Sequence, residues 1–368
     1  MSRAPGEVRD SIVEYLDAIG AAAALSEIHA AVEADLGPTP SSSVRSYLNH
    51  NTPTQFQRVE RGRYCLKEEH RPYVSDPVRR RTTIGLATVN LADSFDWLAA
   101  REANSVHAVV TDPPYGLVEY SETQQQKMRS GKGGVWRIPP SFDGHQRSPL
   151  PRFTVLSAEE LSDLHRFFKR LARLLVRALV PGANVVIASN PLLAHIVSSG
   201  LADGGLELRG MIARLVMTMR GGDRPKNAHH EFRDVSVMPR SMWEPWIVAR
   251  KPLSGRVQDN LRLWDTGGFR RPEEAKPFGD VIRSSPTPVS ERRIANHPSL
   301  KPQAFLRQVV RAALPLGKGV LLDPFAGSGS TLAAANHVGY SSIGVELDSS
   351  YFDLAISAIP RLAMIRTP

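Results

Sequence analysis

The 368-residue chain, with 42% hydrophobic and 23% charged residues, has the size and composition of a globular protein with one large core and a small extra domain. Its only cysteine, Cys65, excludes an internal disulfide framework and a multi-cysteine zinc site, and is typical of a reducing compartment. The formal charge of +9 favours a polyanionic partner. The sequence has neither a signal-peptide core nor an apolar run of about 20 residues, so we expect a cytoplasmic protein with no membrane partner.

The first 75 residues are predicted to form a separate domain of three helices and a hairpin. The spacing of apolar residues places the helices at residues 8–19, 27–36 and 41–49, and two alternating strands at residues 56–60 and 63–66. Ser26 is positioned to cap the second helix. This order resembles a winged helix-turn-helix domain, in which Arg45 and Asn49 on the third helix and Arg61 on the wing would contact DNA. A winged helix that docks onto a protein is the alternative.

Residues 76–368 are predicted to form the large domain, which begins with a linker at residues 76–81. Strands are expected at residues 82–89, 106–110, 184–189, 211–219, 246–250, 319–323 and 342–348, and helices at residues 95–101, 157–180 and 332–338. A capping box of Ser157 and Glu160 opens the longest helix, and Pro181 and Gly182 end it. Strands that alternate with helices predict an α/β fold with an open, mostly parallel, doubly wound sheet.

Two long segments of this domain show little periodicity. Residues 119–152 are expected to be either disordered or a loop that closes over a substrate and touches phosphates through residues such as Lys132. Residues 220–296, rich in Arg, Pro and Gly, are interpreted as a substrate-recognition insertion. The adjacent His229, His230 and Glu231 have no spaced third ligand, so no metal site is predicted.

A reactive turn is predicted where the β-branched strand at residues 106–110 leads into Asp112, Pro113, Pro114 and Tyr115. The prolines fix the backbone, so that a carbonyl oxygen is held as an acceptor beside the Asp112 carboxylate. Two acceptors and the flat ring of Tyr115 suit a planar heterocycle with an exocyclic amino group, because the acceptors stabilise the positive charge that develops when this weak nucleophile attacks. An ordinary exit from a strand is the alternative for the motif taken alone.

A second candidate site follows the strand at residues 319–323. Small residues lead from this strand into the next helix, where they let the backbone approach a ligand closely, and the following strand carries a carboxylate suited to ribose hydroxyls. The turn lacks the third glycine of a dinucleotide fingerprint and the lysine of a phosphate-binding loop, which favours a nucleoside ligand without phosphates. The candidate binding residues are Asp323, Phe325, Ala326, Gly327, Ser328, Gly329, Thr331 and Glu346.

Together these motifs resemble those of the amino-group DNA methyltransferases that use S-adenosylmethionine. Family enzymes carry a DPPY motif at the substrate amino group and an FxGxG motif at the cofactor, and the chain has both, at residues 112–115 and 325–329. The segment HPSLKP at residues 297–302 is similar to one that precedes the cofactor strand in the family, and the order of the motifs resembles the permuted β group. The resemblance covers residues 82–360 and implies a Rossmann-like methyltransferase fold.

The resemblance also implies how the cofactor and the partners are bound. S-adenosylmethionine would lie across residues 325–329 with Glu346 on its ribose, and Asp93, His297 and Lys301 would complete the pocket. The substrate would be double-stranded DNA, from which the target base is flipped because its amino group is unreachable in the stack. Members of the β group often dimerise, so a homodimer is expected. A cognate restriction endonuclease is a further candidate partner.

The identity of the target base follows from the reactive turn. Tyr115 would stack on the flipped base while Asp112 and the Pro113 carbonyl accept hydrogen bonds from its amino group. Aspartate at the first motif position resembles adenine-N6 enzymes, whereas cytosine-N4 enzymes more often carry serine, so adenine N6 is the expected target and cytosine N4 the alternative. Methylation of RNA or of a protein glutamine, and a non-catalytic DNA-binding regulator, are further alternatives. Methylation of cytosine C5 is disfavoured, because it needs a nucleophilic cysteine in a Pro-Cys context and Cys65 follows Tyr64.

Overall fold

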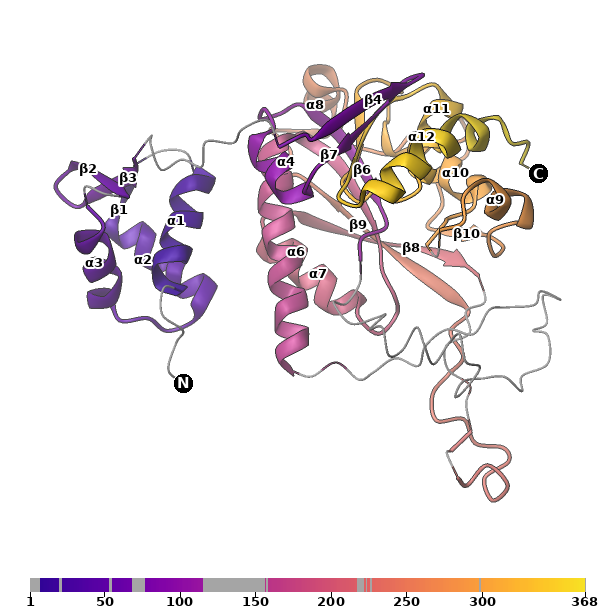
Figure 1. Ribbon diagram of the computed structural model, residues 1–368, viewed down its shortest axis with the longest axis horizontal. Helices are drawn as coiled ribbons and strands as arrows, with labels where there is room; N and C mark the ends of the chain where they lie inside the picture. The colour runs from indigo at the N-terminus through magenta and orange to yellow at the C-terminus, as the bar shows by residue number, and fades with distance from the viewer. Residues whose placement is uncertain are drawn as a thin grey trace. The chain divides into compact units, whose positions relative to one another are not determined.

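The computed structural model describes residues 7–19, 22–52, 55–67, 77–114, 156, 158–216, 222, 224–225, 227–297 and 299–367. The chain divides into two compact units, Met1–Asp76 and Pro77–Pro368, which are described separately (Figure 1). Among the described residues, no helix is both long enough and apolar enough to cross a membrane.

The small unit is built from three helices and a three-stranded antiparallel sheet. Its elements are α1 (Glu7–Ile19), β1 (Ala23–Ala24), α2 (Leu25–Leu36), α3 (Ser41–His50), β2 (Phe56–Glu60) and β3 (Arg63–Leu66), with the strand order β1-β3-β2. Ile12, Val32 and Leu48 are fully buried where the three helices meet. The prediction that Ser26 caps α2 is wrong: the helix begins at Leu25, because Ala23 and Ala24 pair with β3 immediately before it. The cap residue is Ala24, whose N–H donates to the Glu27 carboxylate at 2.6 Å.

The large unit contains a nine-stranded sheet in the order β10-β8-β9-β7-β6-β11-β12-β5-β4. The strands are β4 (Arg80–Ile84), β5 (Ala87–Leu91), β6 (Val106–Thr111), β7 (Leu179–Ala188), β8 (Glu207–Leu215), β9 (Trp243–Arg250), β10 (Val281–Arg283), β11 (Val320–Asp323) and β12 (Ser341–Glu346). Within this sheet only β9, against both of its neighbours, and the edge strand β4 are antiparallel. The predicted α/β fold with an open, mostly parallel, doubly wound sheet is therefore confirmed.

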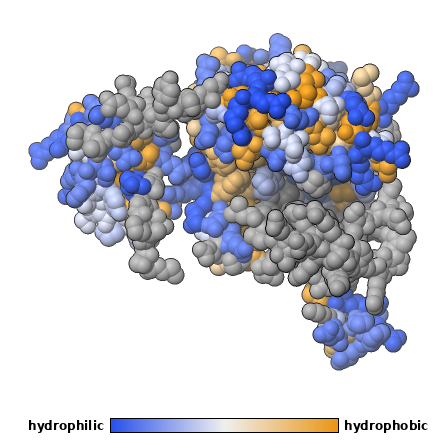
Figure 2. Space-filling model, viewed as in Figure 1, coloured by the Kyte–Doolittle hydropathy of each residue, from blue (hydrophilic) through white to orange (hydrophobic). Residues whose placement is uncertain are grey.

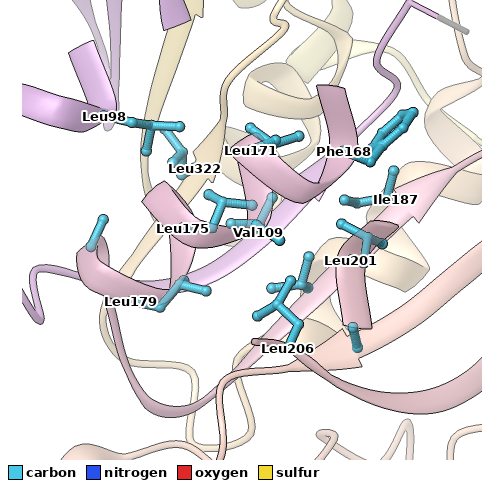
Figure 3. Close-up of a cluster of buried hydrophobic side chains, with 14 of the residues drawn as sticks. Leu98, Val109, Phe168, Leu171, Leu175, Leu179, Ile187, Leu201, Leu206 and Leu322 are labelled. Atoms are coloured by element: carbon cyan, nitrogen blue, oxygen red, sulfur yellow. The ribbon is translucent and has the colours of Figure 1, made fainter. Parts of the chain in front are cut away.

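Helices cover both faces of this sheet (Figure 1). They are α4 (Ser94–Ala100), α6 (Ala158–Ala178), α7 (Ala194–Asp203), α8 (Val257–Trp264), α9 (Val289–Ile294), α10 (Gln303–Ala313), α11 (Ser330–Val338) and α12 (Ser349–Met364). Because side chains alternate along a strand, Val109 on β6 packs in one apolar cluster with residues of α4, α6 and α7 (Figure 3), whereas Ala108 and Val110 pack in another with α10. The result is a three-layer α/β/α unit.

Two predicted boundaries of the large unit are wrong. The expected strand at residues 82–89 is a hairpin of β4 and β5, which reverses at Gly85, a residue with a φ of 61°. The longest helix ends at Ala178, two residues before the expected end, and Pro181 and Gly182 lie inside β7. They fall at a register shift between β6 and β7, where a β-bulge accommodates a proline without a missing ladder hydrogen bond. The predicted capping residue Ser157 lies outside the described residues.

The range of residues 220–296, interpreted as a substrate-recognition insertion, has regular structure in part. It contains β9, α8, β10 and α9, and β9 is an interior strand of the sheet. Residues 227–242, all of them described, contain no helix or strand and are almost entirely exposed. This exposed extension projects from the body of the large unit (Figure 1) and is mainly hydrophilic in the view of Figure 2.

Candidate functional site

Two loops meet at one edge of the sheet because β6 and β11 are parallel neighbours. β6 ends at Thr111 and β11 ends at Asp323, so the turns that begin at Asp112 and Pro324 leave the sheet side by side. The buried Thr111 hydroxyl donates to the Asp323 carboxylate at 2.6 Å and joins the two strand ends. This edge is the switch point at which doubly wound sheets bind ligands.

A cavity of about 360 Å³ opens between the two loops. It is lined by Asp93, Ser94, Phe95, Asp112, Pro113, Pro114, Phe167, His297, Ser299, Pro324, Phe325, Gly327, Val345, Glu346, Leu347 and Tyr351. The lining thus comes from the carboxyl ends of four parallel strands, β5, β6, β11 and β12. It also comes from α6, from α12 and from the segment that follows α9.

The glycine turn after β11 is shaped for close approach. Gly327 has a φ of 51°, which favours glycine, and its N–H donates to Glu346 Oε2 at 2.7 Å. The other carboxylate oxygen of Glu346 accepts from the Asp348 N–H at 2.8 Å. Burial raises the pKa of Glu346, although these backbone hydrogen bonds oppose the shift. Glu346 therefore fixes the turn and also presents its carboxylate to the cavity.

His297 packs on the other side of Gly327. A Cβ atom on residue 327 would lie only 3.1 Å from Cε1 and Nε2 of the imidazole. Burial, aided by the charge of Lys301, lowers the pKa of His297 to about 4, so the ring is neutral at pH 7. The Ser299 N–H donates to Nδ1 at 3.2 Å, and the edge of the ring contacts Tyr351 with the centroids 4.5 Å apart.

The cavity combines aromatic walls with acidic groups. The ring centroids of Phe325 and Phe167 are 6.0 Å apart, and those of Phe167 and Phe95 are 5.2 Å apart. Asp93, Asp112 and Glu346 contribute carboxylates, whereas no lysine or arginine is among the described residues of the lining. Such a site attracts a ligand that carries an aromatic ring and a positive charge and has no phosphate groups.

Asp112 is anchored by a buried cluster of charges. Its Oδ2 lies 2.6 Å from Lys301 Nζ, which is also 3.2 Å from Glu244 Oε1, and Arg214 Nη1 lies 2.7 Å from Glu244 Oε2. Burial would raise the pKa of Glu244, but Lys301 and Arg214 lower it to about 2. Burial would likewise lower the pKa of Lys301, but Asp112 and Glu244 raise it. Glu244 and Lys301 are therefore charged at neutral pH.

Asp323 lies behind the cavity and stabilises both loops. Its Oδ1 accepts from the Phe325 N–H at 3.1 Å as well as from Thr111, and the Thr331 side chain is a further hydrogen-bond partner. Burial raises the pKa of Asp323 to about 6, against the effect of these hydrogen bonds. The nearby hydroxyl of Ser94 donates to the Pro324 carbonyl and ties the glycine turn to the start of α4.

Comparisons with known proteins identify the family. The model of the DNA methylase family N6_N4_Mtase matches residues 106–357, more than half of the chain and both of the loops described above. The chain belongs to this DNA methylase family. The methylase is similar to the Type II methyltransferase M2.LlaDCHI of Lactococcus lactis subsp. cremoris, with 27% identity over 72% of this chain and 86% of the relative. It is also similar to the Type II methyltransferase M2.DpnII of Streptococcus pneumoniae, with 25% identity over 72% of this chain and 86% of the relative.

Among solved structures, the methylase is similar to the putative DNA modification methylase TTHA0409 of Thermus thermophilus, determined in complex with S-adenosyl-L-methionine. That similarity has a TM-score of 0.47 and 20% sequence identity, and covers 75% of this chain and 94% of the other.

The structure brings many of the predicted site residues of the methylase together. Those that line the cavity are Asp93, Asp112, Pro113, Pro114, His297, Phe325, Gly327 and Glu346. Behind the lining lie Asp323, Ala326, Ser328, Gly329 and Thr331. Lys301 does not line the cavity. Its ammonium contacts the carboxylates of Asp112 and Glu244. Tyr115 and Lys132 lie outside the described residues, and Arg45, Asn49 and Arg61 are exposed on the small unit.

Sequence reasoning missed several residues at the site. Phe167 and Tyr351 line the cavity, and Glu244 and Arg214 support Lys301. The sequence contained a signal for two of them: Arg214 stands between Ala213 and Leu215, and Glu244 between Trp243 and Pro245, in the apolar parts of two strands. A charge in an interior strand needs a partner, because its burial would otherwise be very costly.

Proposed function

We propose that the methylase transfers a methyl group from S-adenosylmethionine to the N6 atom of adenine at a specific site in duplex DNA. The observation that carries this proposal is the cavity that the Asp112–Pro114 turn and the Phe325–Gly327 turn share at one sheet edge. Membership of a DNA methylase family sets the reaction and the type of substrate.

The residues of the cavity fit S-adenosylmethionine. When bound, this cofactor supplies an electrophilic methyl group on a sulfonium ion. The aromatic side chains of Phe325 and Phe167 suit its adenine ring, and Glu346 suits its ribose hydroxyls. The carboxylates and the neutral His297 favour a cation without phosphates, which distinguishes this donor from ATP and from dinucleotides.

Asp112 and the Pro113 carbonyl are proposed to accept hydrogen bonds from the target amino group. These acceptors direct the nitrogen lone pair towards the methyl carbon and stabilise the positive charge that develops on nitrogen. The bound donor would supply the methyl group to this nitrogen, and the surplus proton on the nitrogen would leave to solvent. We propose that the base is flipped out of the duplex and stacks on Tyr115.

The base can be identified directly. Duplex DNA is incubated with the purified protein and S-adenosylmethionine, digested to nucleosides and analysed by mass spectrometry. We expect N6-methyladenosine in its deoxy form. N4-methyldeoxycytidine in its place would overturn the choice of adenine and support the cytosine alternative, and unmodified DNA would overturn the proposed function. Sequencing genomic DNA with modification detection, with and without the gene, would then give the recognised site.

We propose that residues 1–75 form a winged helix-turn-helix domain that reads DNA. Support comes from the order of its elements and from α3, whose face with Arg45 and Asn49 is exposed. In the full chain, replacing Arg45, Asn49 and Arg61 together by Ala should weaken DNA binding by tenfold or more, roughly the loss expected for three DNA contacts. Lys318→Ala, which removes an exposed positive charge from the large unit, is the control. Unchanged affinity and site choice would favour a protein-docking domain.

Four further proposals concern partners and location. The exposed extension, residues 227–242, is proposed to contact DNA beside the target base, because His229, His230 and Arg233 are exposed. The similarity to Type II methyltransferases favours a cognate restriction endonuclease, which would fail to cut DNA that this protein has modified. A homodimer, to be checked by light scattering, and a cytoplasmic location complete the proposal.

A further inference from the structure

Four charged side chains from distant parts of the sequence form one buried cluster beside the cavity. Asp112 follows β6, Arg214 lies on β8, Glu244 on β9, and Lys301 in the segment before α10. The side chains of Lys301 and Asp112 are only 11% and 13% exposed. A buried lysine between two carboxylates is costly to assemble unless its geometry is tightly defined.

We propose that Lys301 is a positioning residue for methyl transfer, which holds the Asp112 carboxylate ionised and oriented towards the target amino group. This inference rests on the proposed function, in which Asp112 accepts from that amino group. It assigns Lys301 to the substrate side of the site and not to the cofactor.

The supports of Lys301 are themselves fixed. Arg214 donates to Glu244 at 2.7 Å, to Ser284 Oγ at 3.0 Å and to the Ser285 carbonyl at 2.9 Å. Its guanidinium also lies over the Phe305 ring, 5.2 Å from the centroid. With Glu244 held in this way, its second oxygen is placed 3.2 Å from Lys301 Nζ.

Glu244 has a further donor on its own strand. The Trp246 indole N–H donates to Glu244 Oε2 at 3.1 Å, and the Trp246 side chain is fully buried. Lys301 therefore approaches Asp112 from a rigid base built by β8 and β9, and it cannot relax to solvent. An ammonium held at 2.6 Å fixes one carboxylate oxygen of Asp112. It also favours the charged form of the carboxylate, which accepts a hydrogen bond from an amino group.

Removing the ammonium should therefore change the pH dependence of the reaction. The charged or titratable groups that face Asp112 and Lys301 are Glu244 and Arg214 from β9 and β8, Asp323 from the end of β11, and His297 from the segment before Lys301. These groups are present in the wild type and in a Lys301→Met variant. The difference between the two pH profiles thus reports the loss of the ammonium beside Asp112. A neighbouring cation lowers the pKa of a carboxylate by about 1–3 pH units, so its removal raises that pKa by a similar amount.

The test compares Lys301→Met, a neutral side chain of similar length, with the wild type. We expect kcat at pH 7 to fall at least tenfold and the acid limb of the kcat profile to move up by about 1–3 pH units. Binding of S-adenosylmethionine, measured by calorimetry, should change less than about threefold, which is small beside the 1.4 kcal/mol of a tenfold change. Lys301→Met with Glu244→Gln removes the leftover negative charge and serves if the single variant folds poorly.

A matched control is Lys251→Met. Lys251 donates to the Leu179 carbonyl at 2.7 Å and to Asn104 Oδ1 at 2.9 Å, at the opposite edge of the sheet from Asp112. This variant removes another partly buried lysine and should leave kcat and its acid limb unchanged. A similar loss in both variants would show a general structural effect and overturn the inference.

Two other results would also overturn it. One is a Lys301→Met enzyme whose kcat and acid limb match the wild type, and the other is a variant that regains full kcat at saturating cofactor after a large loss of cofactor affinity. Failure of the proposed function is distinguishable, because it would appear in the wild type as an absence of methylated adenine. The inference on Lys301 fails only in the comparison between wild type and variant.

Discussion

Gly327→Ala tests how the glycine turn forms the cofactor site. The new methyl carbon would meet two atoms of His297 at 3.1 Å, in a residue whose φ is 51°. An alanine in this left-handed region costs about 1–2 kcal/mol. A turn that relaxes to avoid this strain also loses the hydrogen bond from its N–H to Glu346, a charge-assisted interaction of about 1.5–3 kcal/mol.

The empty site can relax in this way, but cofactor binding requires the original turn. Binding must then restore the strained conformation. The cost of the backbone strain and the loss of the hydrogen bond to Glu346 overlap in part, so they do not add in full. We expect S-adenosylmethionine to bind about 2–3 kcal/mol more weakly, which corresponds to about a 30- to 140-fold higher Kd. Isothermal titration calorimetry on the wild type and the variant measures this difference directly.

Gly339→Ala is the matched control. Gly339 ends α11 with a φ of 80°, and a Cβ there would have no heavy atom of the described residues within 4 Å. It imposes a similar backbone strain without a clash and without a place in the cavity lining. We expect a loss of about 1 kcal/mol in the free energy of unfolding and an unchanged Kd. Equal Kd values for Gly327→Ala and the wild type would refute the assignment of this turn to the cofactor.

Three further predictions concern stability, measured by urea unfolding. His297 takes up a proton below pH 6.5 in the unfolded chain, but only below about pH 4 in the folded protein. As the pH falls from 7 to 4, the free energy of unfolding of the wild type should therefore fall by about 3 kcal/mol more than that of His297→Asn. Asp323 has the opposite sign: the folded state keeps its proton up to about pH 6, so Asp323→Asn should gain about 2 kcal/mol in the free energy of unfolding relative to the wild type between pH 4 and 7. Parallel stability curves would contradict either assignment. Asn260 is fully buried and donates to the Pro181 and Thr266 carbonyls, so Asn260→Ala should cost about 2–4 kcal/mol without changing the Kd for cofactor, and a cost below about 1 kcal/mol would be inconsistent with this network.

The two chemical loops could be predicted because each is a local signal. An apolar β-branched run that stops at Pro113 and Pro114, and a strand that turns through Gly327, define strand ends without knowledge of the rest of the fold. Parallel pairing then places the ends of β6 and β11 at one edge. The cavity between them is lined by residues of both turns.

Boundaries were predicted less well, because tertiary pairing overrides local preference. The alternation of residues 82–89 continues across Gly85, so that one strand and a tight hairpin have the same pattern. Pro181 and Gly182 read as a helix stop, but a bulge places them inside β7, where a Cβ on Gly182 would collide with Asn260. That contact joins residues 78 positions apart, and no local pattern contains it.

The contacts of Lys301 could not be predicted for the same reason. Its membership in the HPSLKP segment placed it near the cofactor, but its ammonium contacts Asp112, 189 residues earlier in the chain. Only the fold shows that Glu244 stands on the other side of this lysine.

The most direct test of the central claim is methyl transfer by Asp112→Ala, measured together with cofactor binding. In the proposed function Asp112 accepts a hydrogen bond from the target amino group, so we expect the transfer rate to fall about 100- to 1000-fold. The Kd for S-adenosylmethionine should stay close to the wild-type value. An Asp112→Ala protein that methylates duplex DNA at the wild-type rate would contradict the account.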